Sequence, residues 1–558
     1  MVQDAAQKTL QQKAGLAWDE QSSSFRIRIP QKANIAADTV GRHAQGAKRN
    51  STALIFENLE GQVFQWTFAE VDEQANRLAA ALRRRGLGRG TRIAVHTGLR
   101  PETAIAHMAI HKLGGIVVTL SQLYGSNAVG HVLNHSEAAA IITQDSAWQR
   151  FREQHFPALA HCIVVGQAAA GEIPFEALVE EPAGDFEPAE TQADDPALLM
   201  YTSGSTGMPK GLLHGHRILH AYSPTVSMFY NLELDEPDLV CWTPADWAWV
   251  GGLLDLLLPA WEHGQTVVTS ESRFSAEWAF AFMERHGVTH SFMTPTALKR
   301  LAEIRNPKAR WNITLRTVCT GGEALPAETW KWLQGELGVC CNEFYGLTEF
   351  NHLIGCCQAL YPSLPGSMGK AFPGHTVAVV DEDGREVPDG EVGQIVARDD
   401  DPTRFLGYWK NPELTEAMQL GQWLKTGDLA KRDAAGYFWY QGRADDLIKT
   451  AGYRVGPGEV ENALLKHDDV AEAAVIPSPD AGRGSIIKAL VRLKTGAAAS
   501  DDLKLSLQDM VKQSLAAYKY PREIEFVESF PLTSSGKINR KALALEERQR
   551  KLGGAERP

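Results

Sequence analysis

Long apolar runs and a secretion signal are both missing from this sequence of 558 residues. No apolar run reaches the roughly 18 residues that a membrane-spanning helix needs. Asp255 and Pro259 interrupt the best candidate, residues 250–260. The segment 1–16 is polar and lacks the apolar core of a secretion signal. We therefore expect neither a membrane span nor a cleaved leader.

The sequence also lacks an excess of positive charge and cysteines spaced for a metal site or a disulfide. The net charge is −12, which is a poor basis for binding nucleic acid, and the one basic run, residues 83–85, ends a predicted helix. The seven cysteines include two adjacent pairs, at 340–341 and 356–357, and none has C-x-x-C spacing. Adjacent cysteines are awkward disulfide partners, so we expect reduced thiols in a cytoplasmic protein.

Short β-rich runs alternate with helical segments along most of the chain. A helix is predicted over residues 68–85, where the apolar spacing is helical and Gly86 follows. Strands are predicted near residues 93–95, 116–118, 140–142, 163–165 and 266–268, with a helix over 104–113. Residues 171–195 have no clear period and are expected to form an exposed connector. This alternation favours a parallel sheet covered by helices on both faces.

The stretch from Tyr201 to Gly211, Y-T-S-G-S-T-G-M-P-K-G, has the composition of a phosphate-binding loop. Its glycines allow close approach of the backbone to a ligand, its hydroxyls are donors, and Lys210 adds a positive charge. The apolar run 198–200 before it predicts a buried strand. It is not a Walker loop, because Pro209 precedes the lysine and Gly211 follows it.

In order, these residues resemble the signature of the AMP-forming adenylating enzymes, a superfamily of acyl-CoA synthetases, luciferases and peptide-synthetase adenylation domains. Further segments resemble later motifs of the superfamily: Y-G-L-T-E at 345–349, G-G-E-A at 321–324, T-G-D at 426–428, G-R-A-D-D at 442–446 and P-L-T-S-S-G-K-I-N-R at 531–540. The resemblance covers about residues 50–541. The branch that looks most similar is that of the medium-chain acyl-CoA synthetases.

The resemblance implies a role for each matching residue. Lys537, Lys210, Thr348 and Glu349 are the expected catalytic residues, Glu349 being the Mg²⁺ ligand. Asp445 is the expected hinge residue, and Ala451, Gly452 and Arg454 are expected to bind CoA. Lys537 is also a candidate for control by acetylation. The residues expected to bind ATP or AMP are Thr202, Ser203, Gly204, Ser205, Thr206, Gly207, Lys210, Gly322, Glu323, Ala324, Asn342, Glu343, Phe344, Tyr345, Thr348, Asp428, Arg443 and Lys537.

The chemistry explains why cations are needed. A carboxylate must attack the α-phosphorus of ATP, and two unit charges about 4 Å apart repel by roughly 4 kcal/mol at an effective dielectric near 20. Mg²⁺, Lys210 and Lys537 are the cations expected to offset this repulsion. The acyl-adenylate is then open to the thiol of CoA. The implied co-substrates are ATP and CoA, and no nucleophilic side chain is required.

The acid itself is the least determined part. Asp246, Trp247, Trp249, Val250 and Gly346 lie where the superfamily builds its acyl pocket, although aromatic-rich runs are also common in plain cores. Acetate-activating relatives have a tryptophan at the position of Gly346. A glycine there is expected to leave room for a short- or medium-chain, branched or aromatic acid longer than acetate. Nearby Gly251, Gly252 and Gly355 add no bulk.

The resemblance also implies the fold class: α/β, with a large N-terminal domain of doubly wound sheets plus a small β-rich subdomain, and a small mobile α+β C-terminal domain. The expected boundaries are a polar lead-in at 1–50, the adenylating domain at 51–443, the mobile domain at 444–545 and a charged tail at 546–558. Two other functions stay open. One is stand-alone activation of an amino or aryl acid for a carrier protein, with Asp246 holding an amino group; the other is a nucleotide-binding regulator without catalysis.

Overall fold

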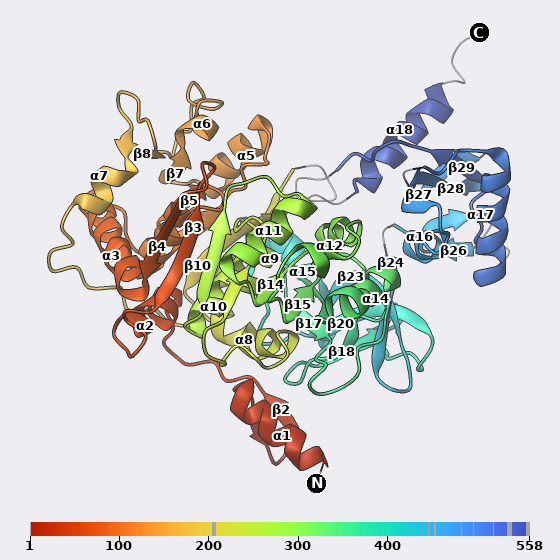
Figure 1. Ribbon diagram of the computed structural model, residues 1–558, viewed down its shortest axis with the longest axis horizontal. Coiled ribbons are helices and arrows are strands. Elements are labelled where there is room, and N and C mark those ends of the chain that lie inside the picture. The colour runs from red at the N-terminus through yellow and green to blue at the C-terminus, as the bar shows by residue number, and fades with distance from the viewer. Residues whose placement is uncertain are drawn as a thin grey trace. The chain divides into compact units, whose positions relative to one another are not determined.

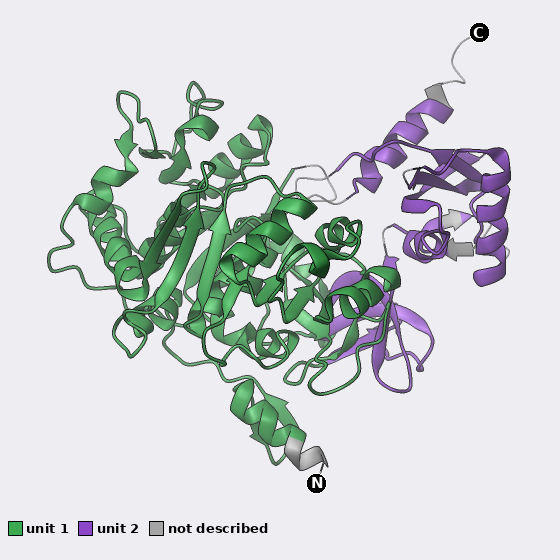
Figure 2. Cartoon of the chain, viewed as in Figure 1, with its two compact units in different colours: residues 1–376, 398–422 green, residues 377–397, 423–558 purple. Residues whose placement is uncertain are grey.

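The computed structural model describes residues 2–202, 208–444, 446–450, 453–480, 482–494, 496–516, 518–532 and 538–553. The chain forms two compact units (Figure 2). Unit 1 contains residues 1–376 and 398–422, and unit 2 contains residues 377–397 and 423–558. The expected α/β fold, with a large N-terminal and a smaller C-terminal part, is confirmed.

Unit 1 contains an eight-stranded sheet in the order β21-β11-β10-β6-β5-β7-β8-β9. Figure 1 labels β10, β5, β7 and β8 of this sheet. From β10 to β9 the neighbouring strands are parallel, as the alternation of strands and helices predicted. The other two strands, β11 and β21, are antiparallel to their neighbours. The strand bounds are β5 (Arg92–His96), β6 (Ile116–Thr119), β7 (Ala140–Gln144), β8 (His161–Val165), β9 (Ile173–Pro174), β10 (Pro196–Thr202), β11 (Lys210–Gly215) and β21 (Gly407–Tyr408).

A second sheet of unit 1 runs β18-β17-β16-β15-β14-β12-β13-β3-β4. Its central strands, from β16 to β3, are parallel, and the strands at both ends are antiparallel. The bounds are β3 (Thr52–Glu57), β4 (Val63–Thr67), β12 (Val240–Trp242), β13 (Thr266–Ser270), β14 (His290–Phe292), β15 (Thr317–Thr320), β16 (Cys340–Leu347), β17 (Asn351–Gly355) and β18 (Gly369–Ala371).

Helices connect these strands. The predicted helix at 68–85 is α3 (Phe68–Arg84), whose start is fixed by a capping box in which Thr67 and Glu70 exchange hydrogen bonds. The helix predicted over 104–113 is α4 (Pro101–Lys112). The other elements in unit 1 after α3 and α4 are α5 (Ser126–Ser136), α6 (Asp145–Trp148), α7 (Phe175–Glu180), α8 (Ile218–Phe229), α9 (Val250–Gly252), η2 (Leu253–Leu257), α10 (Leu258–Glu262), α11 (Ala276–His286), α12 (Pro295–Ala302), α13 (Pro307–Arg310), α14 (Ala327–Trp332), η3 (Leu333–Leu337), α15 (Pro412–Glu416) and β22 (Gln419–Leu420).

Two segments have more structure than the sequence pattern predicted. The lead-in contains α1 (Val2–Lys13), the hairpin β1 (Ala17–Asp19) and β2 (Ser24–Arg26), η1 (Ala37–Gly41) and α2 (Arg42–Ala44). Its few apolar side chains, among them Leu10, Leu16 and Ile35, are buried in the main core of unit 1. The connector at 171–195 contains α7, which buries Phe175 and Leu178. Apolar residues this far apart show no helical or strand period in the sequence, yet their side chains are buried in the core.

Unit 2 combines a β-rich part with an α+β part. The antiparallel pairs are β19 with β20 and β23 with β24, and β27-β28-β29 form a three-stranded sheet that packs against α16 and α18. The bounds are β19 (Val377–Val380), β20 (Val392–Arg398), β23 (Trp423–Arg432), β24 (Tyr437–Arg443), β25 (Ile448–Thr450), β26 (Tyr453–Val455), α16 (Pro457–Leu464), β27 (Val470–Asp480), β28 (Gly484–Leu493), α17 (Asp501–Ser514), β29 (Glu523–Phe526) and α18 (Arg540–Gly553).

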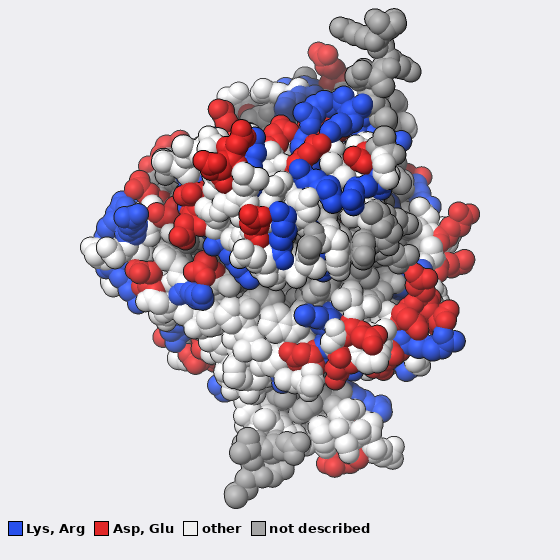
Figure 3. Space-filling view, turned by 90° about the vertical axis from the view of Figure 1, so that its right-hand side faces the viewer, with Lys and Arg blue, Asp and Glu red and all other residues white. Residues whose placement is uncertain are grey.

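Charged side chains of both signs share the surface. Figure 3 shows Lys and Arg interspersed with Asp and Glu over the face that it draws. Within α17 such charges pair three residues apart, as in Lys504 with Asp501 and Lys512 with Asp509. A search of the described residues finds no helix that is both long and apolar enough to cross a membrane.

Candidate active site

The phosphate-binding stretch begins and ends on two neighbouring strands. Thr202 ends β10 and Lys210 begins β11, and the two residues are cross-strand partners in the antiparallel pair. Tyr201 pairs with Gly211 one step further from the loop. The backbone therefore turns back on itself between Thr202 and Lys210. Ser203, Gly204, Ser205, Thr206 and Gly207 lie outside the described residues.

Helix α5 supports both limbs of this turn. Its His135 contributes Nδ1 to a hydrogen bond of 2.9 Å with the Tyr201 hydroxyl. One helical turn earlier, His131 donates through Nε2 to the carbonyl oxygen of Pro209 at 2.9 Å. Gly211 is needed for close packing, because a Cβ there would lie 3.1 Å from side-chain atoms of Leu199 and Tyr201. The base of the loop is thus held by contacts that no local pattern revealed.

Lys210, Tyr408 and Glu349 gather beside this turn from three separate segments. The Lys210 ammonium lies 6.0 Å from the centre of the Tyr408 ring. The Tyr408 hydroxyl donates to Oε1 of Glu349, in a short hydrogen bond. The first and last of these residues are the lysine and the carboxylate that sequence reasoning had assigned to phosphate and Mg²⁺. Tyr408, which contacts both predicted site residues, was not singled out from the sequence.

The strand that leads to Glu349 is β16, which is buried along most of its length. Asn342 is completely buried, donates from Nδ2 to the Phe229 carbonyl oxygen at 3.0 Å and accepts from Gln358 N at 3.1 Å, so its amide is engaged within the protein. Phe344 is also buried and stacks on Phe229 with ring centres 4.4 Å apart. Contact of these two side chains with a nucleotide stays a prediction.

Glu343 is the one carboxyl group of this strand that has an unusual environment. It is 8% exposed, and its Oε1 accepts from Leu325 N at 3.1 Å. Burial raises the pKa of Glu343 from 4.5 to about 8, so the group holds a proton at neutral pH. A neutral carboxyl group can donate as well as accept a hydrogen bond.

The segment predicted to line the adenine follows β15. Gly321 lies against β16 so tightly that a Cβ would come within 2.7 Å of the Phe344 ring. Gly322 has φ near +85°, a conformation that favours glycine. Glu323 accepts from the Thr296 hydroxyl at 2.8 Å, which anchors it to α12, while Ala324 is exposed.

The pair predicted to bind ribose lies in unit 2. Asp428 and Arg443 are cross-strand partners in the β23–β24 hairpin, and their charged groups are 3.7 Å apart. The Tyr440 hydroxyl also donates to Oδ1 of Asp428, at 3.3 Å. The structure therefore brings these two predicted residues together. Lys537, Asp445, Ala451 and Gly452 lie outside the described residues, and of Arg454 only the backbone, in β26, is described.

The aromatic stretch predicted to line the acyl pocket divides between core and partly exposed positions. Trp247 is 1% exposed and belongs to the main core, whereas Trp249 is partly exposed and lies edge-on to Tyr124 at 5.6 Å. Asp246 accepts from Ser121 Oγ at 2.7 Å and from Ala248 N at 3.0 Å. Burial raises the pKa of Asp246. Val250, which begins α9, is partly exposed.

The expectation that Gly346 leaves open space for the acid is wrong. An added Cβ would lie 1.5 Å from the carbonyl oxygen of Asn351, so the space beside Gly346 is filled by the backbone of β17 and is not an open pocket floor. The same holds for Gly251, where a Cβ would meet the Phe292 ring at 2.4 Å, and for Gly355, where it would meet Phe372 at 2.2 Å. These glycines permit close packing. A sequence shows which side chain is missing but not what occupies its place.

Comparison with known proteins identifies the family of the chain. Residues 41–409 match the family described as AMP-binding enzyme, and residues 459–537 match its C-terminal domain. The chain belongs to this family. It is 36% identical to an acetyl-coenzyme A synthetase of Bacillus subtilis, over 94% of this chain and 92% of that protein. The mitochondrial acyl-coenzyme A synthetase ACSM4 of Homo sapiens is 32% identical, over 93% and 91%.

A solved structure gives the same result. The crystal structure of the anthranilate CoA ligase AuaEII with anthranoyl-AMP matches with a TM-score of 0.85 and 29% identity, over 94% of this chain and 99% of that one. The chain is therefore an AMP-forming acyl-CoA synthetase of the adenylate-forming superfamily. It activates a carboxylic acid to acyl-AMP and transfers the acyl group to CoA.

Three histidines lie on β11 or shortly after it. His214 and His216 are buried, and burial lowers the pKa of each to about 4, so both are neutral at pH 7. His220 pairs with Asp38 at 3.0 Å. Within the described ranges, no group of three or more His, Cys, Asp or Glu side chains is arranged to hold a metal ion. A single carboxylate such as Glu349 can still serve Mg²⁺, which takes most of its ligands from phosphates and water.

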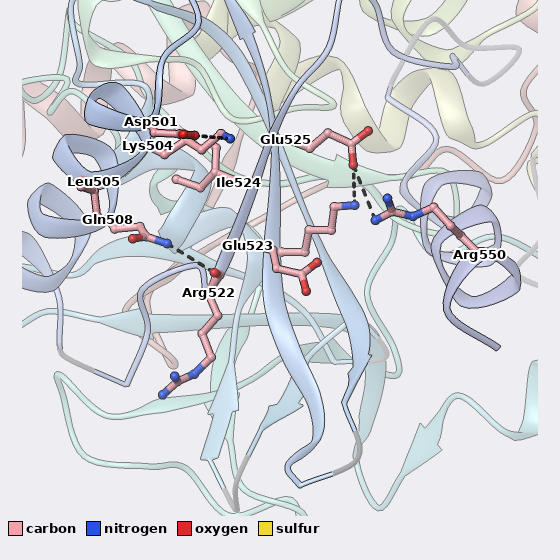
Figure 4. Close-up of a pocket in the computed structure, with 10 residues that line it drawn as sticks. Asp501, Lys504, Leu505, Gln508, Arg522, Glu523, Ile524, Glu525 and Arg550 are labelled. Carbon is pink, nitrogen blue, oxygen red and sulfur yellow. Dashed lines mark hydrogen bonds and ion pairs between the residues drawn. The ribbon is translucent and has the colours of Figure 1, made fainter. Parts of the chain in front are cut away.

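Unit 2 carries an open groove of about 590 Å³ that contains none of the predicted site residues (Figure 4). It lies between α17, β29 and α18. Figure 4 shows Glu525 linked to Arg550 across it, and other lining charges are also paired, as in Lys504 with Asp501. Paired charges leave little net field for a charged ligand, and we assign the groove no part in the reaction.

Proposed function

We propose that this synthetase activates a short- or medium-chain, branched or aromatic carboxylic acid longer than acetate. The observation that carries the catalytic part is the meeting of Lys210, Tyr408 and Glu349 beside the turn between β10 and β11. It supports a phosphate site with a cation on one side and a metal-binding carboxylate on the other. Anthranilate is the acid of the ligase AuaEII, which supports a larger acid; the Bacillus relative is named for acetate.

In the proposed site, the backbone and hydroxyls of residues 202–207 hold the β- and γ-phosphates, and Lys210 offsets their charge. Tyr345 stacks on the adenine, while Gly322, Glu323 and Ala324 line its other side. Thr348 donates to the α-phosphate. Asp428 accepts from the ribose hydroxyls with Arg443 beside it, which agrees with their cross-strand pairing. Glu343 adds a protonated carboxyl group on β16, the strand that also carries Tyr345.

Glu349 is the residue that would hold Mg²⁺. The carboxylate suits a hard cation, and the Tyr408 hydroxyl orients it by donating to one oxygen. When bound, Mg²⁺ neutralises charge on the phosphates. The remaining steps depend on the residues of the chain.

The first half-reaction joins the acid to AMP. A carboxylate oxygen of the acid attacks the α-phosphorus, a P–O bond forms, and the bond to pyrophosphate breaks. Lys537 is the proposed second cation of this step, close to the charge that develops on the leaving pyrophosphate. Lys210 stays with the departing phosphates. Lys537 is also the proposed site of control by acetylation, because acetylation removes its charge.

The second half-reaction transfers the acyl group. The CoA thiol loses its proton to solvent, its sulfur attacks the acyl carbon and forms a thioester bond, and AMP leaves with the electron pair of the broken C–O bond. We propose that the residues after Asp445 turn about this hinge and that Ala451, Gly452 and Arg454 then line the path of the pantetheine arm. Lys537 is not needed in this pose.

Activation of an amino acid for a carrier protein has less support. That function requires Asp246 to hold an α-amino group, but both carboxylate oxygens of Asp246 accept hydrogen bonds, from Ser121 and from Ala248. Burial also disfavours its charged form, because it raises the pKa. A raised pKa weakens the attraction for a cationic amine.

The deciding experiment is a screen of pyrophosphate release over carboxylic acids from two to twelve carbons, with branched, aromatic and amino acids included, with and without CoA. We expect CoA-dependent thioester formation, and a kcat/KM for acetate 10- to 200-fold below that of the best acid. A preference for acetate would contradict the proposed acid class. Release that needs an amino acid and no CoA would favour the carrier-protein function.

A further inference from the structure

One helix, α5, contacts the ends of three strands around the predicted phosphate site: β10, β11 and β21. Its His135 contributes Nδ1 to a hydrogen bond of 2.9 Å with the hydroxyl of Tyr201 on β10. Its His131 donates from Nε2 to the carbonyl oxygen of Pro209, the residue before β11, at 2.9 Å. The carbonyl oxygen of His135 accepts from Nε1 of Trp409, directly after β21, at 3.1 Å. Two histidines one helical turn apart therefore connect α5 to all three strands.

The two imidazole rings pack together and against Tyr201. Residues four apart lie on the same face of a helix, so the rings are neighbours. Their centres are 5.2 Å apart, and their planes differ by 13°. The Tyr201 ring lies edge-on to both, with its centre 6.4 Å from that of His131 and 5.8 Å from that of His135. The Tyr124 hydroxyl donates to the Tyr201 carbonyl oxygen at 3.0 Å, so Tyr201 is held at its hydroxyl, its ring and its backbone.

Pro209 explains why a side chain is needed on the second limb of the turn. Among the described residues, Thr202 and Lys210 are the cross-strand pair of β10 and β11 nearest the turn. Pro209 is one residue closer to the turn, and because proline has no N–H it cannot donate to a further ladder bond. Its carbonyl oxygen accepts from His131 instead. This hydrogen bond therefore fixes the backbone next to Lys210 at the point where the ladder ends.

Stability alone gives little reason for hydrogen bonds at these positions. Both histidines are partly exposed, and water can replace a hydrogen bond that is lost near the surface. The same bonds matter more for a ligand. A ligand that binds a loop loses less entropy when the loop is already held in its bound conformation. Contacts that hold both limbs of a phosphate-binding turn are therefore expected to raise the affinity for the phosphates more than the stability of the fold.

We propose that His131 and His135 are positioning residues for ATP, which hold the two limbs of the turn between β10 and β11 at the separation that the phosphates require. The inference rests on the proposed function, in which residues 202–207 and Lys210 hold the β- and γ-phosphates. Both histidines act through the backbone and side chains of the turn and not on a reacting atom. Their effect is therefore confined to the half-reaction that uses ATP. Transfer of the acyl group to CoA, which follows the release of pyrophosphate, does not depend on them.

The test removes each hydrogen bond and then restores it. His131→Leu and His135→Leu keep an apolar side chain but have no polar group. His131→Gln and His135→Asn restore one, because the glutamine amide reaches the place of Nε2 and the asparagine amide reaches the place of Nδ1. His161→Leu is the matched control. His161 is also partly exposed, begins β8 of the same sheet and donates from Nε2 to a backbone carbonyl oxygen, that of Arg85, at 3.2 Å.

The measurements are KM for ATP and kcat of acid-dependent pyrophosphate release, the rate of thioester formation from supplied acyl-adenylate, and the melting temperature. We expect each leucine variant to raise KM for ATP roughly three- to tenfold, which is the contribution of one hydrogen bond. Because ground-state binding is lost, kcat at saturating ATP and the thioester rate should stay within about twofold of the wild type. His131→Gln and His135→Asn should bring KM for ATP back to within about twofold of the wild-type value. His161→Leu should leave KM for ATP unchanged.

The outcomes separate this inference from the proposed function. If the wild type releases pyrophosphate with no carboxylic acid, the proposed function fails. If the wild type is active and both leucine variants fold but keep the wild-type KM for ATP, the positioning role is refuted. It is also refuted if the amide variants do not recover the affinity for ATP, if the thioester rate falls as far as the rate of adenylate formation, or if His161→Leu has the same effect. If the leucine variants do not fold while His161→Leu does, the two histidines are structural only, and the assignment is overturned.

Discussion

The protonated state of Glu343 is open to a quantitative test through Glu343→Gln. Glutamine keeps the shape of the side chain and the oxygen that accepts from Leu325 N, but it has no proton to lose. The folded-state pKa of Glu343 is about 8, above the ordinary value of 4.5. Above pH 4.5 the unfolded chain releases this proton while the folded chain keeps it. Wild-type stability therefore falls as pH rises toward 8, and the variant escapes that loss.

The expected change in stability follows from the difference between the folded and unfolded pKa of Glu343. Each pH unit between 4.5 and 8 costs the wild type about 1.4 kcal/mol relative to the variant. From pH 5 to pH 7.5 the difference should therefore grow by about 3 kcal/mol. A unit of roughly 400 residues unfolds with an entropy near 0.8 kcal/mol/K, so the melting temperatures should diverge by about 3–4 °C over that range.

The assay is the melting temperature of both proteins at several values of pH, with KM for ATP at pH 7.5. Glu233→Gln is the matched control in unit 1. Burial alone would raise the pKa of Glu233, but hydrogen bonds from His290, Asn231 and Thr317 outweigh burial and lower it to about 2. The contribution of the Glu233 carboxylate to stability is complete above pH 4.5 and is lost only at lower pH. The melting temperature of this control should therefore differ from that of the wild type by a constant amount between pH 5 and pH 7.5. A constant difference for Glu343→Gln would refute the protonated carboxyl group.

Three further changes test the proposed reaction. Lys537→Ala should lower acid-dependent pyrophosphate release by roughly 10²-fold yet spare thioester formation from supplied acyl-adenylate; equal loss in both would contradict the two-pose mechanism. Gly452→Leu should obstruct thioester formation in single turnovers and leave adenylate formation nearly intact, so a normal thioester rate would remove Gly452 from the CoA path. Gly346→Ala should lower the melting temperature, because the new Cβ meets Asn351 O at 1.5 Å, whereas Gly335→Ala, which meets nothing within 4 Å, should not. Equal melting temperatures would show that β17 gives way.

The chemistry could be predicted from contiguous residues. The composition of the stretch 201–211 was enough to predict a phosphate-binding loop, whereas the expected role of the motif at 345–349 came from its resemblance to the superfamily. The alternation of strands and helices is equally local, and the predicted helix at 68–85 differs from α3 by a single residue. Asp428 and Arg443 were assigned to one site by the resemblance of T-G-D and G-R-A-D-D to the superfamily motifs, and the β23–β24 hairpin pairs the two residues.

Only the tertiary structure decided which distant side chains meet. Tyr408 reaches Glu349 through the pairing of β21 with β11, and Asp255 of η2 forms a hydrogen bond with His352 of β17. These contacts depend on strand register and packing, which no short stretch of sequence encodes. The sequence likewise showed that Gly346 lacks a side chain, but the neighbouring strand determines whether the vacated volume is open. Here the Asn351 carbonyl oxygen fills that volume, because a glycine without a Cβ allows the neighbouring strand to pack closely against it.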